Sequence, residues 1–127
     1  GLILMNPSEK PLIYACSGCS NVAQLANDVA VALDRAGDAE MSCISGVGGG
    51  VKKLVNVATS GRKIIALDGC PLHCVSCCLK NIGVKPDYHL TLSNLGFKKK
   101  YGEDFNDHVC EQVVKDIRES VIYRSAE

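Results

Sequence analysis

The stretch that decides the fold is "IIALDGCPLHCVSCCLKN", residues 64–81. Its first residues complete "KIIAL", 63–67, which is the strongest strand signal in the chain. An unbroken apolar run of this kind favours a parallel sheet that is covered on both faces. Pro71 is typical of the first turn of a helix, and we expect that helix to continue to Ile82 and to end at Gly83. A buried strand therefore runs directly into a segment that contains four of the eight cysteines.

The same order of strand and helix recurs on both sides of this stretch. Ser20 has the side chain of an N-cap, and apolar residues follow it at helical spacing until Gly37 provides a stop. Strands that alternate with helices imply right-handed crossovers and a parallel sheet between two helical layers. The predicted fold is α/β, a three-layer α/β/α arrangement with a four-stranded parallel sheet, flavodoxin-like or Rossmann-like, in the strand order 2-1-3-4. We expect strands over 12–15, 40–44, 63–67 and 87–92, helices over 21–36, 51–58 and 71–82 and from about 106 onward, a glycine-rich turn at 45–50 and a polar loop at 93–105.

Length and charge narrow the class of protein. The 127 residues match one domain, which we place at 11–123 between a flexible N-terminus, 1–10, and a tail, 124–127. Fourteen basic residues balance fourteen acidic ones, so charge gives no reason to expect nucleic acid or a membrane surface as a partner. The run Lys98–Lys100 is expected to be a solvated loop. Without a long apolar run or a signal peptide, we expect a cytoplasmic protein, whose cysteines serve metal binding or thiol chemistry because disulfides do not persist there.

Cysteines stand where the first three predicted strands end. Cys16 follows the first strand, Cys43 lies near the end of the second, and Cys70 follows the third. The carboxyl ends of parallel strands share one edge, which is where open α/β sheets bind ligands. Adjacent strands are about 4.8 Å apart and the sulfurs of a tetrahedral zinc site roughly 3.8 Å apart, so Cys16 should reach both other thiols. If Cys70 opens a helix, one turn brings Cys74 to the same side, which completes a four-thiolate zinc site.

The chain also has the means to offset the charge of such a site. One Zn²⁺ and four thiolates together carry a net charge of about −2. Three helices are predicted to begin near this edge, with their positive N-terminal ends and free N–H groups facing it. Gly18, Gly46 and Gly69 would let backbone N–H groups approach the sulfurs closely and donate to them.

Several blocks of the sequence resemble one known family. They are "CSGCSNVAQLANDVAVALDRAG" (16–37), "MSCISGVGGGV" (41–51), "IIALDGCPLHC" (64–74) and "LSNLGFKKK" (92–100). In this order they resemble the DGC-domain family of zinc-binding proteins, which takes its name from Asp-Gly-Cys, here residues 68–70, and the resemblance extends over about residues 12–120. It implies zinc chelation by four cysteines and no established biochemical activity. Carried over, the four ligands fall on Cys16, Cys43, Cys70 and Cys74.

The other cysteines admit several interpretations. Many relatives have alanine where this chain has Cys19, and Cys77 and Cys78 are additional to the family pattern. Cys19 could replace one of the four ligands, and the three together could hold a second ion or an iron–sulfur cluster. Cys78 could equally pack on the sheet. Cys110 lies on the apolar stripe of the last predicted helix, so we expect it in the core.

The histidines and Asp68 are expected to serve structure rather than ligation. His73 lies between two candidate ligands, but neighbouring helical positions face different ways. His89 falls within a strand, where a buried and hydrogen-bonded imidazole is the usual arrangement, and His108 should be exposed at the start of the last helix. For Asp68 we favour a cap at the end of the strand over an acceptor that supports a metal ligand.

Three functions compete for these cysteines. The first is a zinc-binding protein for metal sensing, storage or delivery; its full cysteine ligation leaves no open position, so we do not expect a hydrolytic enzyme. The second is a thiol redox or sulfur-handling protein that uses Cys16-Ser-Gly-Cys19, whose position at a helix start should lower the thiol pKa. The third is an iron–sulfur protein, since four thiolates suit either metal. A phosphatase loop is excluded because Val22 stands where that loop needs arginine.

Overall fold

A computed structural model describes residues 9–124 of the chain. The predicted flexible N-terminus and tail therefore lie almost wholly outside the described residues. Within 9–124, four strands form one parallel sheet in the order β2-β1-β3-β4, which confirms the predicted α/β fold and strand order. In this same range, no helix combines the length and the apolar character that crossing a membrane requires. The strands are β1 (Leu12–Ala15), β2 (Glu40–Met41), β3 (Ile64–Asp68) and β4 (Tyr88–Thr91).

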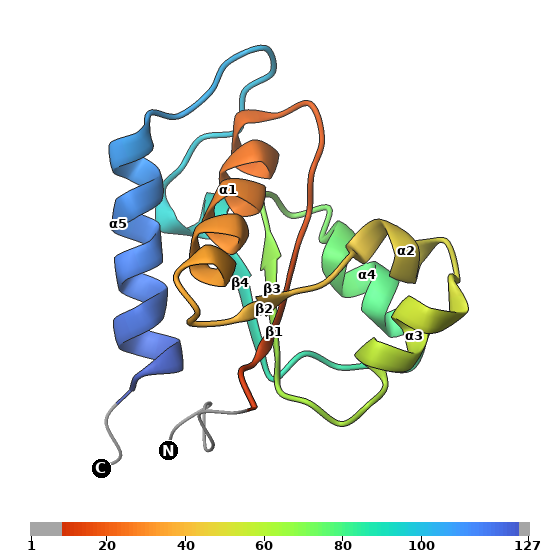
Figure 1. The fold of residues 1–127 in the computed structure, drawn as a ribbon. Helices are drawn as coiled ribbons and strands as arrows, with labels where there is room; N and C mark the ends of the chain where they lie inside the picture. The colour runs from red at the N-terminus through yellow and green to blue at the C-terminus, as the bar shows by residue number, and fades with distance from the viewer. Residues whose placement is uncertain (1–8, 125–127) are drawn as a thin grey trace.

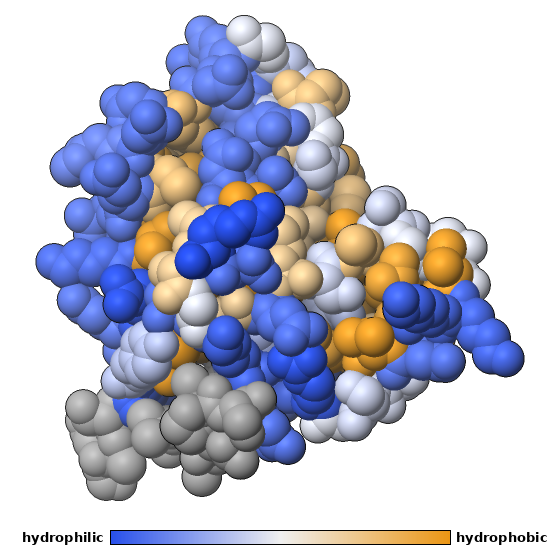
Figure 2. Space-filling model, in the orientation of Figure 1, coloured by the Kyte–Doolittle hydropathy of each residue, from blue (hydrophilic) through white to orange (hydrophobic). Residues whose placement is uncertain are grey.

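Helices cover both faces of the sheet (Figure 1). Alternate residues of β1 point to opposite faces: Ile13 packs into a core with α1 and α5, and Tyr14 into a second core with α2, α3 and α4. On the face shown in Figure 2, apolar side chains reach the surface over α2 and α3, where Val51 is 50% exposed. The helices on the first face are α1 (Asn21–Arg35) and α5 (Asp107–Ile117), and those on the second are α2 (Ile44–Gly48), α3 (Lys52–Ala58) and α4 (Cys74–Asn81).

The longest helix begins and ends as its sequence predicts. The Ser20 side chain accepts a hydrogen bond from the Ala23 amide at 3.2 Å, so it is the N-cap of α1. Gly37 follows the helix with a φ of 81°, a conformation that suits glycine. At the other end of the chain, Asn106 caps α5 by accepting from the Val109 amide at 3.1 Å.

The helix predicted over 71–82 begins later than expected, at Cys74. His73, just before it, has a φ of 54° and a ψ of 47°, which is left-handed and interrupts a right-handed helix. Cys70 therefore does not open the helix. It opens a turn that a hydrogen bond from the His73 amide to the Cys70 carbonyl closes at 3.2 Å. Cys74 consequently sits at the first position of α4, reached through this turn rather than through one turn of helix.

The second strand and the glycine-rich turn also differ from the prediction. The strand predicted over 40–44 is limited to Glu40–Met41, because Cys43 already serves as the N-cap of α2. Residues 45–50 were expected to form a turn, but the first four of them belong to α2. Gly46 contributes to this packing: a Cβ placed there would lie 1.9 Å from Leu54 Cδ1, so glycine lets α2 rest against α3 without displacing the Leu54 side chain. A short 3-10 helix, η1 (Leu92–Leu95), takes the last residue of the predicted strand 87–92 and the first three of the predicted polar loop 93–105. Helix α5 continues into a π-helical turn, η2 (Arg118–Ile122).

Candidate functional site

Two of the predicted ligands, Cys16 and Cys70, follow the ends of the neighbouring strands β1 and β3. Cys16 follows β1, and its sulfur accepts a hydrogen bond at 3.1 Å from the amide of Gly69, the residue after β3. Cys70 is the next residue along the chain. The predicted close approach of the Gly69 amide to a cysteine sulfur is therefore confirmed.

Gly69 is needed at this position because the backbone of α1 lies directly against it. A Cβ at Gly69 would stand 2.7 Å from the Val22 carbonyl carbon and 2.8 Å from the Ala23 amide nitrogen. Backbone atoms of a helix cannot move aside as the end of a flexible side chain can. The contact thus holds the end of β3, and with it Cys70, close to the first turn of α1.

Burial decides the protonation of the Cys16 thiol. It raises the pKa of Cys16 to about 11; the Gly69 amide opposes this shift, and Asp68, Cys74 and Cys70 add to it. The lowered pKa that we predicted for Cys16 is therefore wrong. Its premise fails too, because α1 begins at Asn21 and leaves Cys16 in the preceding loop. In the folded chain without metal, Cys16 is a neutral thiol at physiological pH.

Lys99 provides a positive charge beside Cys70. Its ammonium donates to the Cys70 sulfur at 3.5 Å and lies 5.2 Å from the centre of the Tyr101 ring. The buried side chain of Asn21 holds this loop in place, since it donates to the Lys98 carbonyl at 3.0 Å and accepts from the Lys100 amide at 2.7 Å. We expected this lysine run to be a solvated loop; the contact between Lys99 and Cys70 joins residues 29 positions apart, beyond the reach of a local sequence pattern.

A polar network connects the Cys70–Cys74 turn and the end of β3 with strand β4. The buried Asp68 carboxylate lies 2.7 Å from His89 Nε2, and His73 Nε2 lies 3.0 Å from the Thr91 hydroxyl. The hydrogen bond predicted for His89 is confirmed, but its predicted burial is wrong, because β4 turns this residue to the exposed side of the strand. Asp68 does act as a cap, as predicted, although it caps α4 and not its own strand. The predicted exposure of His108 is also confirmed.

Cys43 is the N-cap of α2. Its exposed side chain lines a groove of about 520 Å³ between α1 and the segment that joins β2 to α2. The groove is bordered by Asn27 and Arg35 of α1 and by Ser45 of α2. The Ser42 amide bonds the Ile13 carbonyl at 3.2 Å, so the residue before Cys43 still follows β1 towards the carboxyl edge of the sheet.

The remaining cysteines occupy different environments. Cys19 and Cys77 are exposed. Cys78 is half-buried in the core beneath α4, where its sulfur lies so close to α2 that a Cβ at Gly48 would come within 3.0 Å of it. Cys110 packs against the core between α1 and α5, as predicted.

The described part of the chain does not present a closed ligand shell. Among residues 9–124, no group of three or more His, Cys, Asp and Glu side chains is placed so that it could hold a metal ion. Cys70 and Cys74 lie near enough to Cys16 to raise the pKa of its thiol. Cys43 lines the groove that Ala15 and Ser17 border. The ligand set of Cys16, Cys43, Cys70 and Cys74 stays a prediction, and so do the additional roles considered for Cys19, Cys77 and Cys78.

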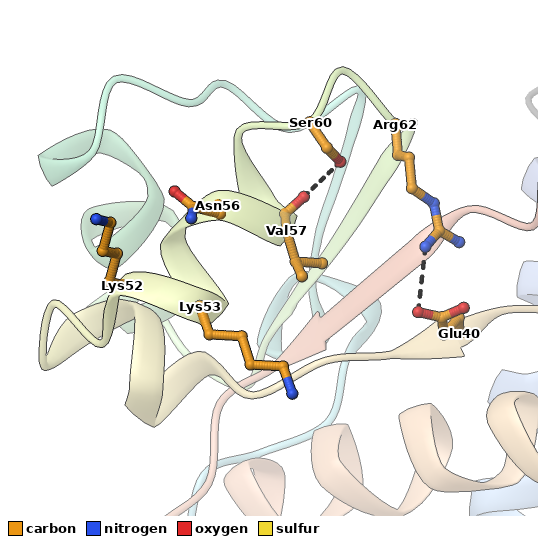
Figure 3. A pocket seen from close by; sticks show the side chains of 7 residues that line it. All are labelled: Glu40, Lys52, Lys53, Asn56, Val57, Ser60 and Arg62. Atoms are coloured by element: carbon orange, nitrogen blue, oxygen red, sulfur yellow. Dashed lines mark hydrogen bonds and ion pairs between the residues drawn. The ribbon is translucent and has the colours of Figure 1, made fainter.

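A larger hollow, of about 730 Å³, lies away from the thiols between α3 and the amino end of β2 (Figure 3). Arg62 is engaged there with Glu40 at 3.1 Å and with the Lys10 carbonyl at 2.6 Å. Figure 3 shows that the side chains of Lys52 and Lys53 point in different directions. Because these cations do not converge on one point, we place the candidate site at the thiols.

Comparisons with known proteins place this geometry in context. A family model described as "DGC domain" matches residues 12–117. The protein named "Anaerobic and virulence modulator AnvM" from Pseudomonas aeruginosa is 63% identical over 107 residues, which are 84% of this chain and 82% of that protein. No solved structure matches the chain.

Proposed function

The chain belongs to the DGC-domain family, and on that premise we propose that it binds Zn²⁺ through cysteine thiolates at the carboxyl edge of the sheet. The proposed ligands are Cys16, Cys43, Cys70 and Cys74. The observation that carries the proposal is the hydrogen bond from the Gly69 amide to the Cys16 sulfur, which joins the ends of the two central strands at 3.1 Å. It supports the proposal because it joins the thiol that follows β1 to the residue before Cys70, at the edge where such sheets bind ligands.

The donor set and its surroundings fit a zinc thiolate centre. Thiolates are preferred zinc ligands, and a backbone N–H that donates to sulfur stabilises the charged form. Lys99 adds a positive charge beside Cys70, which offsets part of the net negative charge of about −2 that such a centre carries. Cys43 is the outlying ligand in this proposal, and its exposed thiol lies in the loop that leaves the neighbouring strand β2.

A regulatory or metal-handling role suits this centre better than catalysis. A zinc ion with four cysteine ligands has no open position for a substrate or a water molecule. The relative from Pseudomonas aeruginosa is named a modulator, which supports regulation, with sensing, storage or delivery of metal as the possible forms. The thiol-redox alternative loses support at Cys16, because its raised pKa makes the thiol a poor nucleophile.

Metal analysis of purified protein tests the proposal. Protein prepared anaerobically, without added metal and without an affinity tag that binds metal, should contain about one zinc per chain. Serine in place of Cys16, Cys43, Cys70 or Cys74 should remove most of this zinc. Cys110→Ser is the matched control, since this half-buried cysteine of α5 packs against the core, is not a proposed ligand and should leave the zinc content unchanged.

Two outcomes would overturn zinc binding. One is less than about half an equivalent of metal together with complete titration of the thiols by a chromogenic disulfide. The other is a brown protein that contains iron and sulfide, which would establish the iron–sulfur alternative. If Cys19→Ala or Cys77→Ala abolished zinc binding while Cys43→Ser did not, the ligand set would have to be changed.

A further inference from the structure

The first turn of α4 is capped from outside the helix. The Asp68 carboxylate, only 1% exposed, accepts hydrogen bonds from the Val75 amide at 2.8 Å and from the Ser76 amide at 3.3 Å. These are N–H groups that the start of a helix leaves without intrahelical partners. An N-cap residue often satisfies them, but the ring of the N-cap His73 turns to Thr91 instead. The end of β3 therefore fixes the start of the helix that carries Cys74.

A second layer of contacts holds Asp68 and the turn in place. His89, on the neighbouring strand β4, lies 2.7 Å from the second carboxylate oxygen of Asp68. Its ring meets the His73 ring edge-on, with 5.0 Å between the centres. His73 is the only non-glycine residue among 9–124 with a positive φ, a conformation that persists where surrounding contacts impose it. Here those contacts are the ring of His89 and the hydroxyl of Thr91.

All of these contacts join protein groups to protein groups. The turn that presents Cys70 and Cys74 is held by the sheet, and the Ser93 amide secures it further by donating to the Gly69 carbonyl at 3.0 Å. This differs from small zinc domains, in which the ion itself supplies the folding energy and the metal-free chain is unfolded.

We propose that Asp68 and His89 are positioning residues that hold the Cys70–Cys74 turn in its binding conformation without metal, so that the metal can leave and return while the chain stays folded. This inference rests on the proposed zinc site and deepens it. It makes the ion exchangeable rather than structural, as sensing or delivery requires. Asp68 and His89 act through the backbone of the turn and are not themselves ligands in this account.

Asp68→Asn and His89→Gln test the proposal, with Asp87→Asn as the matched control. Asp87 accepts a hydrogen bond from the Ile64 amide at 2.8 Å. It therefore joins the segment before β4 to the amino end of β3, whereas Asp68 lies at the carboxyl end of β3. Zinc affinity is measured by competition with a chromogenic chelator, and stability by thermal melting of the metal-free protein. We expect Asp68→Asn and His89→Gln to weaken zinc binding about 10- to 100-fold, as substitutions of residues that orient metal ligands do. Asp87→Asn should leave zinc affinity within about twofold of the wild type.

Hydrogen exchange of the metal-free protein provides a readout that does not depend on zinc. The amides of Val75 and Ser76 should be protected in the metal-free wild type and should exchange much faster in Asp68→Asn, with the core amides of β1 unchanged. In Co²⁺-loaded protein, the thiolate-to-cobalt absorption should weaken in the same variant. If Asp68 contributed only to overall stability, the melting temperature would fall and exchange would speed up at the amides of β1 as much as at those of Val75 and Ser76.

Each outcome decides between the proposals. A metal-free wild type that is unfolded, or whose Val75 and Ser76 amides are unprotected, would overturn the inference, because metal would then build the turn. Equal losses of zinc affinity in Asp68→Asn and Asp87→Asn would overturn it too. If the wild type bound no zinc, the proposed function would fail, while the exchange data would still decide whether Asp68 holds the turn. If Asp68→Asn failed to fold, His89→Gln, which keeps the carboxylate, would carry the same measurements.

Discussion

The two edges of the sheet both use a carboxylate to tie a neighbouring segment to β3. At the amino edge, Asp87 accepts from the Ile64 amide at 2.8 Å and lies 3.7 Å from the Lys63 ammonium. At the carboxyl edge, Asp68 binds two amides of α4 and the ring of His89. Asp87 has a side chain that is 38% exposed, whereas that of Asp68 is 1% exposed. The carboxylate that joins a neighbouring segment to β3 is thus partly solvated at the amino edge and buried at the carboxyl edge.

The groups around the buried carboxylates at the two edges, Asp38 and Asp68, also differ in chemistry. At the amino edge, Asp38 is held by the Arg118 guanidinium at 3.0 Å and by the Tyr123 hydroxyl at 2.5 Å. The Arg118 and Tyr123 side chains thus bind a carboxylate of the protein itself. At the carboxyl edge the neighbours of Asp68 include the Cys16 thiol, whose sulfur keeps lone pairs for a ligand. We infer that the amino edge serves stability and the carboxyl edge serves binding, and the following variants test that division.

Removing the two carboxylates should give the largest contrast. Asp68→Ala leaves the buried Val75 amide without its acceptor, and we expect it to lower the free energy of unfolding by about 3 kcal/mol. Asp87→Ala should cost about 1 kcal/mol, because water replaces the lost partner at this half-exposed position. Urea denaturation of the metal-free proteins measures both changes. Equal losses would contradict the difference that we draw between the edges.

Adding a methyl group on either side of β3 should give the next largest contrast. In Gly69→Ala the new carbon meets the backbone of Val22 at 2.7 Å, and we expect a loss of about 2 kcal/mol together with weaker zinc binding. At Gly61, which precedes β3, a Cβ meets no described atom within 4 Å, but the φ of 86° strains any side chain by about 1 kcal/mol. Denaturation and zinc titration of both variants provide the test. A larger loss at Gly61, or unchanged zinc binding in Gly69→Ala, would speak against the close approach.

Tyr123→Phe should affect stability alone and in a pH-dependent way. The hydrogen bond to Asp38, and to a smaller extent burial, raises the pKa of Tyr123. A raised pKa means that the bond contributes fully below the ordinary pKa of about 10 and is lost as pH rises above it. Near pH 7 the variant should therefore be less stable by about 1 kcal/mol, and the gap to the wild type should close above pH 10. Denaturation at several pH values, with zinc affinity measured in parallel, provides the test. A stability gap that stays constant with pH, or a loss of zinc affinity, would contradict the prediction.

Lys99→Ala should have the smallest effect, and only on binding. Its ammonium contacts the Cys70 sulfur, so removing it should weaken zinc binding roughly threefold, as expected for a surface charge pair. Because salt screens such pairs, the difference should shrink at high ionic strength. Lys98→Ala, one residue earlier in the same loop, is the control and should bind zinc like the wild type. Identical effects of the two substitutions would show that only the overall charge of the loop matters.

Local patterns account for what could be predicted of the fold. The apolar run 63–67, the alternation of strands and helices, the cap at Ser20 and the start of the last helix near 106 depend on residues a few positions apart, and the structure confirms them. The helix boundary at Cys74 was missed because the left-handed His73 is held by Thr91, a residue 18 positions away. The helix at 44–48 was missed for a similar reason, since Gly46 reads as a turn residue until Leu54 packs against it.

The same distinction applies to the candidate site. Cysteines at the ends of strands 1, 2 and 3 could be predicted to share an edge, because parallel strands align their carboxyl ends and the spacing of strands is general. The Lys99–Cys70 contact and the Asp68–His89 pair could not be predicted, since they join residues 29 and 21 positions apart in the chain. The pKa of Cys16 was predicted in the wrong direction, because burial is a property of the packed molecule.

The sequence by itself determined the parallel α/β sheet, its strand order and the placement of cysteines at one edge, because hydrophobic periodicity and strand-end chemistry are local and repeat along the chain. Only the tertiary structure decided which groups surround those thiols: the Gly69 amide at Cys16, the ammonium of Lys99 at Cys70, and the carboxylate of Asp68 under α4. These partners come from separate elements, and their meeting depends on how the helices pack against both faces of the sheet.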